Sequence, residues 1–248
     1  MITSVNNGFV KHARSLKLKK YRAETGEFLV EGEKCVRELI AHMPQKALSL
    51  IICEDKNPDI PEIPDGLSVP VYSVSERVFC AISDEKNPQG IAATARMPLY
   101  DDIHTGFILM LDDVSDPSNV GTMIRTADAA GCSCVVLSPE SADCFSPKAL
   151  RASMGGVFHI PVIRADLEYY IRKLKAAGYA AAAADVRGRE DFMLEADKTC
   201  LIIGNESRGI SEKILSLSDV RIKVPMYGKA ESLNAAVAAG ILMYKIRA

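Results

Sequence analysis

Residues 107–131, FILMLDDVSDPSNVGTMIRTADAAG, join an apolar strand to a helix through a short polar loop. The apolar run that opens this stretch is typical of a parallel strand that helices cover on both faces. Pro117 and Gly121 mark the loop and the helix start, and small residues then allow the helix to pack closely. The same alternation continues to the end of the sequence, which predicts an α/β domain with a mostly parallel sheet over residues 106–248.

The sequence before this stretch alternates shorter elements and predicts a smaller α/β domain over residues 1–100. Between the two domains, MPLYDDIHTG (97–106) has the proline, paired acids and glycine that are typical of a linker. Expected helices lie at about 4–20, 33–42, 75–83, 119–130, 147–153, 167–178, 211–217 and 232–248. Expected strands lie at 27–32, 48–55, 69–75, 90–97, 107–114, 134–138, 158–163, 179–185, 200–205 and 220–225.

Composition limits the class of protein. With 248 residues, of which 48 % are hydrophobic, the chain can build a proper core, and disorder is disfavoured. The net charge of −2 does not indicate nucleic-acid binding by the whole protein, but the first 22 residues are basic and contain no acid. Such a segment is either a solvated helix face or an RNA contact. Its basic residues are Lys11, Arg14, Lys17, Lys19, Lys20 and Arg22.

The seven cysteines are odd in number, form no CxxC pair and lie partly within apolar runs. They are therefore expected to be buried small hydrophobes in a reducing compartment. The four histidines lack metal-ligand spacing, so we expect no metal site. The N-terminus has no apolar signal region and no apolar run reaches about 18 residues, which predicts a cytoplasmic protein without a membrane segment.

Functional residues of open α/β sheets lie in the loops beyond the carboxyl ends of the strands. No GxGxxG and no GxxxxGK[ST] motif follows a strand, so hydride transfer and nucleotide hydrolysis are disfavoured. The loops instead carry three polar, glycine-containing clusters at 116–125, 204–211 and 224–237. Each has an ordinary structural interpretation, in which Arg125 pairs with Asp128, Glu206 caps a helix and Ser232 is a helix N-cap.

The three clusters, in this order, resemble the motifs of the SpoU (TrmH-like) family of SPOUT-class RNA 2′-O-ribose methyltransferases. The matching segments are LDDVSDPSNVGTMIRTADAAG (111–131), LIIGNESRGIS (201–211) and IKVPMYGKAESLNAAVAAGI (222–241), and RASMGGVFHIPV (151–162) is similar to the family's connecting segment. The resemblance implies transfer of a methyl group from S-adenosylmethionine to a ribose 2′-hydroxyl of RNA.

The resemblance also implies a fold and an assembly. Members of this family have a deep C-terminal trefoil knot, a rare exception to the rule against knots, and act as homodimers whose site is completed across the interface. The N-terminal part resembles the substrate-binding domain often fused to these enzymes, with FLVEGEKCVRELI (28–40) as its opening strand and helix. That domain favours ribosomal RNA over transfer RNA as substrate.

The catalytic residues implied by the resemblance come from all three motifs. Arg125 is placed at the 2′-hydroxyl near a substrate phosphate, and Asn119, in the cap position of the same helix, orients Arg125 or the ribose. Because a guanidinium has a pKa above about 12, Arg125 acts more easily as a clamp on hydroxyl and phosphate than as a base, and both roles stay open. Glu206 matches the motif-two carboxylate, and Ser232 and Asn234 match residues that line the catalytic pocket.

The cofactor is held in this family largely by backbone groups and apolar contacts of the knot. The matching positions here are Gly204, Val224 and Leu233, with Met226 and Gly228 close by. Asn205 and Lys229 fall at positions that we regard as variable.

Three alternatives follow from the same residues. The chain could be a non-catalytic RNA-binding factor of ribosome assembly that has kept the fold, although the intact motif residues argue against it. It could also methylate a base rather than a ribose, as other SPOUT branches do, or act on transfer RNA.

Overall fold

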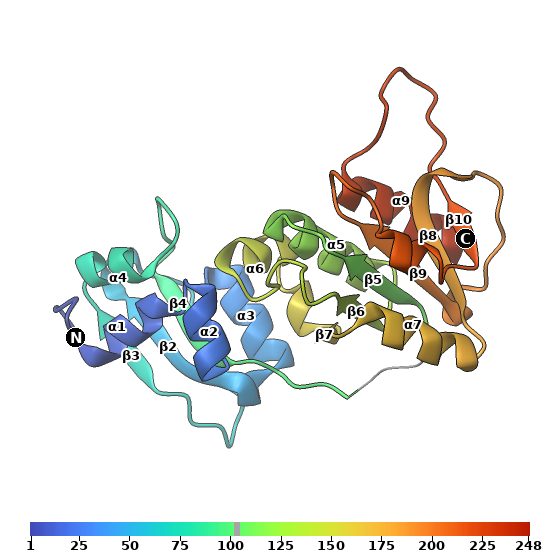
Figure 1. The fold of residues 1–248 in the computed structure, drawn as a ribbon. Helices are drawn as coiled ribbons and strands as arrows, with labels where there is room; N and C mark the ends of the chain where they lie inside the picture. The colour runs from blue at the N-terminus through green and yellow to red at the C-terminus, as the bar shows by residue number, and fades with distance from the viewer. Residues whose placement is uncertain (102–104) are drawn as a thin grey trace. The chain divides into compact units, whose positions relative to one another are not determined.

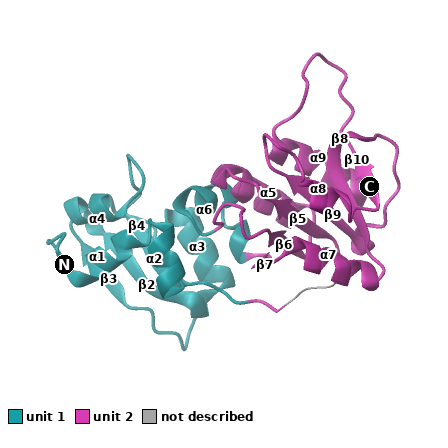
Figure 2. Cartoon of the chain, in the orientation of Figure 1, with its two compact units in different colours: residues 1–99, 145–158 teal, residues 100–144, 159–248 magenta. Residues whose placement is uncertain are grey.

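The computed structural model describes residues 1–101 and 105–248, so the predicted linker at 97–106 lies partly outside the described residues. By contacts the chain divides into two compact units (Figure 2). Unit 1 comprises Met1–Leu99 and Phe145–Phe158, and unit 2 comprises Tyr100–Cys144 and His159–Ala248. In the described part of the chain, no helix is both long and apolar enough to cross a membrane.

Unit 1 contains a four-stranded sheet in the order β1-β4-β2-β3 (Figure 1). β4 runs antiparallel to β1 and β2, whereas β3 is parallel to β2. The first helix packs beside α4 over this sheet, with Val10, Leu16 and Phe79 in one buried cluster. The elements are β1 (Glu27–Glu31), β2 (Ala47–Cys53), β3 (Val71–Val74), β4 (Ile91–Arg96), α1 (Gly8–Ser15), α2 (Lys19–Thr25), α3 (Glu33–His42) and α4 (Glu76–Ile82).

The basic N-terminal segment forms two helices rather than the predicted single helix at 4–20. Two basic side chains of this segment hold the junction between α1 and α2. Arg22 is buried and donates hydrogen bonds of 2.8 Å to the carbonyls of Leu16 and Lys17. Lys17 in turn donates to the carbonyl of Ser83 at 2.7 Å. These two cations are therefore structural.

Residues 145–158 belong to unit 1 although the sequence places them after the first strand and helix of the second predicted domain. They contain α6 (Pro147–Ser153) and a short 3₁₀ turn. Phe28 of β1 packs against the rings of Phe145 and Phe158, with centroid distances of 4.5 and 6.2 Å. The strand predicted at 158–163 is wrong in its first half, because that half lies in this turn and at its end, and β7 begins only at Val162.

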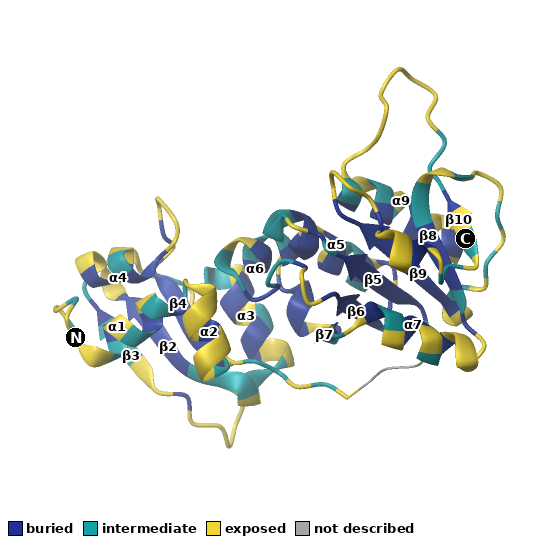
Figure 3. Cartoon of the chain, in the orientation of Figure 1, coloured by how far each residue is buried: buried dark blue, intermediate teal, exposed yellow. Residues whose placement is uncertain are grey.

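Unit 2 is built on a six-stranded, wholly parallel sheet in the order β10-β8-β9-β5-β6-β7, which confirms the predicted α/β class. Its central strands are buried along their whole length (Figure 3). The strands are β5 (Ile108–Asp112), β6 (Cys134–Leu137), β7 (Val162–Arg164), β8 (Ala180–Arg189), β9 (Thr199–Gly204) and β10 (Val220–Ile222), and the helices are α5 (Pro117–Ala129), α7 (Leu167–Ala176), α8 (Glu212–Leu215) and α9 (Ala235–Arg247).

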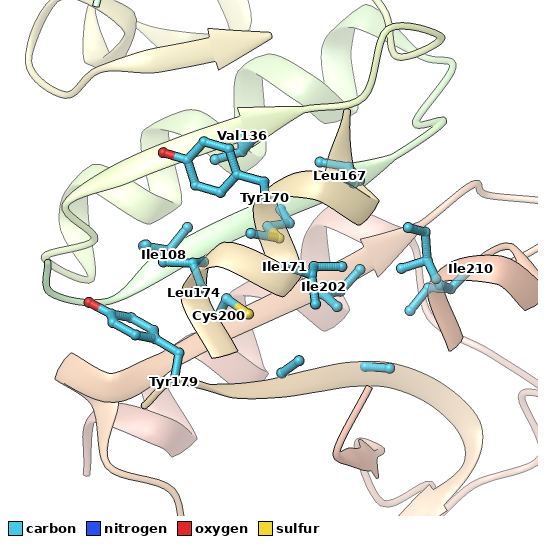
Figure 4. Packing of buried hydrophobic residues seen from close by; sticks show 14 of the residues in the cluster. Ile108, Val136, Leu167, Tyr170, Ile171, Leu174, Tyr179, Cys200, Ile202 and Ile210 are labelled. Carbon is cyan, nitrogen blue, oxygen red and sulfur yellow. The ribbon is translucent and has the colours of Figure 1, made fainter. Parts of the chain in front are cut away.

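Helices cover both faces of this sheet. On one face Tyr170, Ile171 and Leu174 of α7 pack on Ile108 and Ile202 of the central strands (Figure 4). The strand residues next to Ile108 and Ile202 in the sequence point to the opposite face of the sheet, because side chains alternate along a strand. There α9 packs against α5 and β9. Because β5 and β9 are parallel neighbours, the loops that follow them leave the same edge of the sheet and meet there.

Candidate active site

A carboxylate joins the loops that follow the two central strands. Glu206 lies just beyond β9, and its side chain accepts hydrogen bonds from the backbone N–H groups of Ser115 and Asp116 at 3.1 and 3.2 Å. It also accepts a 2.8 Å hydrogen bond from Nδ2 of Asn119. Glu206 therefore ties motif two to the start of α5 instead of capping the helix that follows it.

These donors keep the carboxylate ionised. Partial burial raises the pKa of Glu206, but the hydrogen bond from Asn119 and the backbone N–H groups lower it more. The resulting pKa lies below the usual value for a glutamate. At neutral pH the side chain is thus an acceptor for three donors and has no proton to give.

The same asparagine connects motif one to motif three. Asn119 is buried, and its Oδ1 accepts a 3.0 Å hydrogen bond from Nδ2 of Asn234. Oδ1 of Asn234 then accepts from the backbone N–H groups of Ala236 and Val237 at the start of α9. Since a carboxylate only accepts, the amide orientation of Asn119 is set by Glu206, and that of Asn234 follows.

Two capping interpretations made from the sequence are wrong. The N-cap of α5 is Asp116, whose side chain accepts from the N–H of Ser118, and Asn119 lies inside the first turn. The N-cap of α9 is Asn234, so Ser232 precedes the helix and is exposed. Asn119 is therefore free of a capping role, and its side chain joins the three motifs.

The loop of residues 205–209 folds tightly against the end of β9. A Cβ atom on Gly204 would lie 2.2 Å from the backbone nitrogen of Ile210 and 2.5 Å from the carbonyl oxygen of Gly209, so the position requires glycine. Asn205 shapes the loop, because its Oδ1 accepts from the N–H groups of Ser207 and Arg208. Its Nδ2 donates to the carbonyl of Asp113 at 2.8 Å.

Arg125 lies two turns into α5 with an exposed side chain. Among the residues that the structure describes, it makes no hydrogen bond or ion pair. The alternative in which Arg125 pairs with Asp128 is therefore wrong, since Asp128 bonds instead to Nδ1 of His159 at 2.7 Å. A cation held on a rigid helix without a protein partner is available to a ligand.

A groove runs beside the loops of motifs two and three, formed by two adjoining hollows of about 230 and 440 Å³. Volumes of this order are typical of small-molecule sites, which span roughly 300–1,000 Å³. Val224 and Met226 line the first hollow, Gly204 the second, and Ser232 and Leu233 both. Of the predicted cofactor-binding residues, only Gly228 lines neither. Gly228 is exposed and lies in the segment between β10 and α9.

The structure thus brings Asn119, Glu206 and Asn234 into one hydrogen-bonded chain and places Ser232 on the groove nearby. Sequence reasoning missed Asn205, which was regarded as variable although it organises the loop. An asparagine followed by polar residues and glycine is a turn signal, and that signal could have identified it. It also missed the backbone donors of Ser115 and Asp116, which no sequence pattern reveals.

Comparison with known proteins agrees with this geometry. The SpoU rRNA methylase family matches residues 106–244, and the MRM3-like substrate binding domain matches residues 7–93. The 23S rRNA (guanosine(2553)-2′-O)-methyltransferase of Bacillus subtilis is 40 % identical over 99 % of this chain and 98 % of its own.

Solved structures give the same result. An AdoMet-bound rRNA methyltransferase from Sinorhizobium meliloti superposes with a TM-score of 0.87 at 34 % identity, covering 99 % of this chain and 96 % of the other. The SpoU methyltransferase AviRb from Streptomyces viridochromogenes, in complex with AdoMet, gives 0.84 at 25 % identity, covering 98 % and 97 %. The resemblance stated from the sequence is confirmed, and the chain belongs to the SpoU rRNA methylase family.

Proposed function

We propose that this protein transfers a methyl group from S-adenosylmethionine to a ribose 2′-hydroxyl of ribosomal RNA. The observation that carries the proposal is the chain of hydrogen bonds from Glu206 through Asn119 to Asn234, with Arg125 further along the same helix and unpaired among the described residues. The full-length relative from Bacillus subtilis is named for 2′-O-methylation of a guanosine in 23S rRNA. A ribose of the large-subunit RNA is therefore our first choice of target, and such a substrate implies action in the cytoplasm.

The groove fits the cofactor in chemistry as well as in size. Apolar side chains such as Val224 and Leu233 suit the adenine, and Gly204 lines the second hollow. Carboxylates of Asp185 and Glu231 also line the groove and complement a positive charge. The hydrogen bond from Arg187 is the main reason that the pKa of Asp185 is lowered, so this carboxylate stays ionised. When bound there, S-adenosylmethionine supplies an electrophilic methyl group on a sulfonium sulfur.

The protein must present a weak nucleophile in the correct orientation. A ribose hydroxyl has to lose its proton as its oxygen takes the methyl group, and positioning supplies much of the rate. In this proposal Arg125 clamps the hydroxyl and a neighbouring phosphate with its planar fork of donors. Glu206 accepts hydrogen bonds from the backbone of the loop before α5 and from Asn119 within α5. It therefore holds this helix, and Arg125 with it, in a fixed place.

We also propose that the functional unit is a homodimer. On α9 the apolar side chains of Val237, Ile241 and Tyr244 follow a helical spacing and are 51, 42 and 55 % exposed. They line one hollow surface together with Asn119 and Asn234. A second copy seated on this apolar stripe would exclude water from the asparagine pair and bring a second groove close to it.

The trefoil knot is a further part of the proposal. β10 is the edge strand next to β8, whereas α9, which follows it, packs against α5 and β9. The chain after β10 therefore has to return across its neighbouring strands to reach α5, near the loop at 205–209. This return of the chain, past the loop at 205–209, supports a threaded connection.

The test is transfer of radiolabelled methyl from S-adenosylmethionine to unmodified ribosomal RNA, with transfer RNA in a parallel reaction. We expect label in ribosomal RNA, and nuclease digestion followed by mass analysis should place the methyl group on the sugar. Label on a base, or in transfer RNA alone, would contradict the proposal. Absence of both label and cofactor binding would support the non-catalytic assembly factor instead.

A further inference from the structure

An arginine outside the three motifs organises the loop next to the site. Arg164 is the last residue of β7. Its Nη1 donates hydrogen bonds of 2.7, 2.9 and 2.9 Å to the carbonyls of Ser138, Pro139 and Ser141, and its Nη2 donates one of 2.9 Å to that of Ala142. Within the described residues it makes no ion pair. A guanidinium that binds four backbone carbonyls within residues 138–142 fixes the course of that loop.

The loop fixed in this way holds the chain after β5. Oγ of Ser138 accepts from the N–H of Asp113 at 3.0 Å, and Oγ of Ser141 accepts from that of Val114 at 3.2 Å. Ser141 also donates to the carbonyl of Leu111, and both serines are buried. Asp113 has φ +55°, a conformation that non-glycine residues rarely adopt and that its surroundings must enforce.

The chain turned at Asp113 leads directly to the donors of Glu206. The N–H groups of Ser115 and Asp116 point at this carboxylate because the preceding residues are held from one side by Ser138 and Ser141. From the other side Asn205 donates to the carbonyl of Asp113. Hydrogen bonds thus connect Arg164 to the loop of residues 138–142, that loop to the segment after β5, and that segment to the start of α5, the helix that carries Arg125.

We propose that Arg164 is a positioning residue for methyl transfer: it fixes the 138–142 loop, which fixes the turn that presents the N–H donors to Glu206. The proposal rests on the function proposed above. It explains why an arginine is needed, because a planar guanidinium offers donors in a rigid fork that a lysine ammonium does not reproduce. Arg164 does not line the groove, and its hydrogen bonds go to the loop of residues 138–142, so its effect on the site is indirect.

The experiment compares Arg164→Lys and Arg164→Met with the wild-type protein. We expect kcat to fall on the order of tenfold for Arg164→Lys and more for Arg164→Met, with little change in cofactor Kd, since a small misplacement of reacting groups costs rate. Arg172→Lys is the matched control, because the exposed Arg172 pairs with Glu168 on α7 and, among the described residues, with no other group. Thermal unfolding verifies that each variant is folded.

A second readout is independent of activity and of any merely structural loss. Titration of the Glu206 carboxyl by ¹³C NMR should show a higher pKa in both Arg164 variants, because the N–H donors are released, and no change in Arg172→Lys. The charged groups around Glu206 are otherwise retained in all variants; they are Asp113, Asp116, Asp185, Arg187, Arg208 and Glu212.

The outcomes separate the two proposals. An unchanged Glu206 pKa together with control-like kcat would overturn the role of Arg164. An inactive wild-type protein would overturn the methyltransferase function, and the titration would still decide whether Arg164 holds the donors of Glu206.

Discussion

Nδ2 of Asn234 donates a 3.0 Å hydrogen bond to Oδ1 of Asn119, although 115 residues separate them. Each amide uses both of its ends, since Nδ2 of Asn119 donates to Glu206 and Oδ1 of Asn234 accepts from the start of α9. Removal of any one of these three side chains therefore leaves a hydrogen-bonding group on a neighbouring residue without its partner. The predictions below follow from this property and from the packing around it.

Replacement of Asn119 by alanine should destabilise the protein and perturb Glu206 at once. The change removes a donor from Glu206 and an acceptor from Asn234, which costs about 1–3 kcal/mol in the free energy of unfolding. The pKa of Glu206 should rise. Urea denaturation and carboxyl titration measure the two effects. Ser118→Ala, one residue earlier, is the control, and an equal loss of stability there would contradict the prediction.

The contribution of Glu206 to stability should depend on pH. Its pKa in the folded protein is lowered below the usual value of about 4.3, so its stabilising effect is present above that value and is lost as pH falls through the lowered pKa. The wild-type protein should therefore exceed Glu206→Gln in unfolding free energy at neutral pH. Below about pH 4 the difference should shrink. A difference that grows on acidification would refute the assignment.

Gly204→Ala should disrupt the loop after β9. The added Cβ meets backbone atoms that have no space to move, so we expect a loss of about 2 kcal/mol or more in stability, with loss of cofactor binding. Gly8→Ala is the matched control, because a Cβ on Gly8 meets nothing within 4 Å and its φ is not positive. Calorimetric titration with S-adenosylmethionine, alongside thermal unfolding, distinguishes the two variants.

Arg125→Ala should lower methyl transfer and leave the stability of the protein almost unchanged. The side chain of Arg125 is exposed and makes no hydrogen bond or ion pair with the described residues, so the unfolding free energy should change by less than about 0.5 kcal/mol. Methyl transfer should fall about a hundredfold or more, since the clamp on hydroxyl and phosphate is gone. Arg172→Ala serves as control. A folded Arg125→Ala protein that methylates RNA at the wild-type rate would remove Arg125 from the site.

Ile241→Glu should prevent dimerisation. A carboxylate in the apolar stripe on α9 would be buried without a partner on association, whereas the monomer already exposes this position. Sedimentation velocity should show a monomer with an intact fold and greatly reduced methyl transfer. Tyr169→Glu, at an exposed aromatic position on α7, should leave the dimer unchanged. If both variants stay dimeric, the second copy binds elsewhere.

The sequence predicted elements with strong periodicity most accurately. The helices at 33–42 and 147–153 have the predicted bounds, and the parallel sheet follows from apolar runs such as FILML. Errors occurred where tertiary contacts override local pattern. The N-terminal helix breaks because Arg22 and Lys17 hold a junction that no local rule anticipates.

The sequence predicted which residues belong to the candidate site, but it did not predict the hydrogen bonds between them. The order of the motifs identified Asn119, Glu206 and Asn234, but the capping rules misplaced the starts of α5 and α9 by two and three residues. The donors of Ser115 and Asp116 depend on backbone direction after Asp113, and that direction is set by residues far along the chain. The structure shows the hydrogen bonds of Asn119, Glu206 and Asn234, but the catalytic and cofactor-binding roles of all the predicted site residues stay predictions.

The aromatic partners of Phe28 have a consequence for synthesis. Phe145 and Phe158 are translated long after β1, so a nascent chain that has released residues 1–99 still lacks part of that unit's core. Domains usually fold in the order in which they leave the ribosome. Here the first unit needs residues 145–158, which are encoded within the second, so its core cannot be complete until they are synthesised. A single cut between residues 99 and 105 would not separate the two units, because the chain still joins them on both sides of residues 145–158.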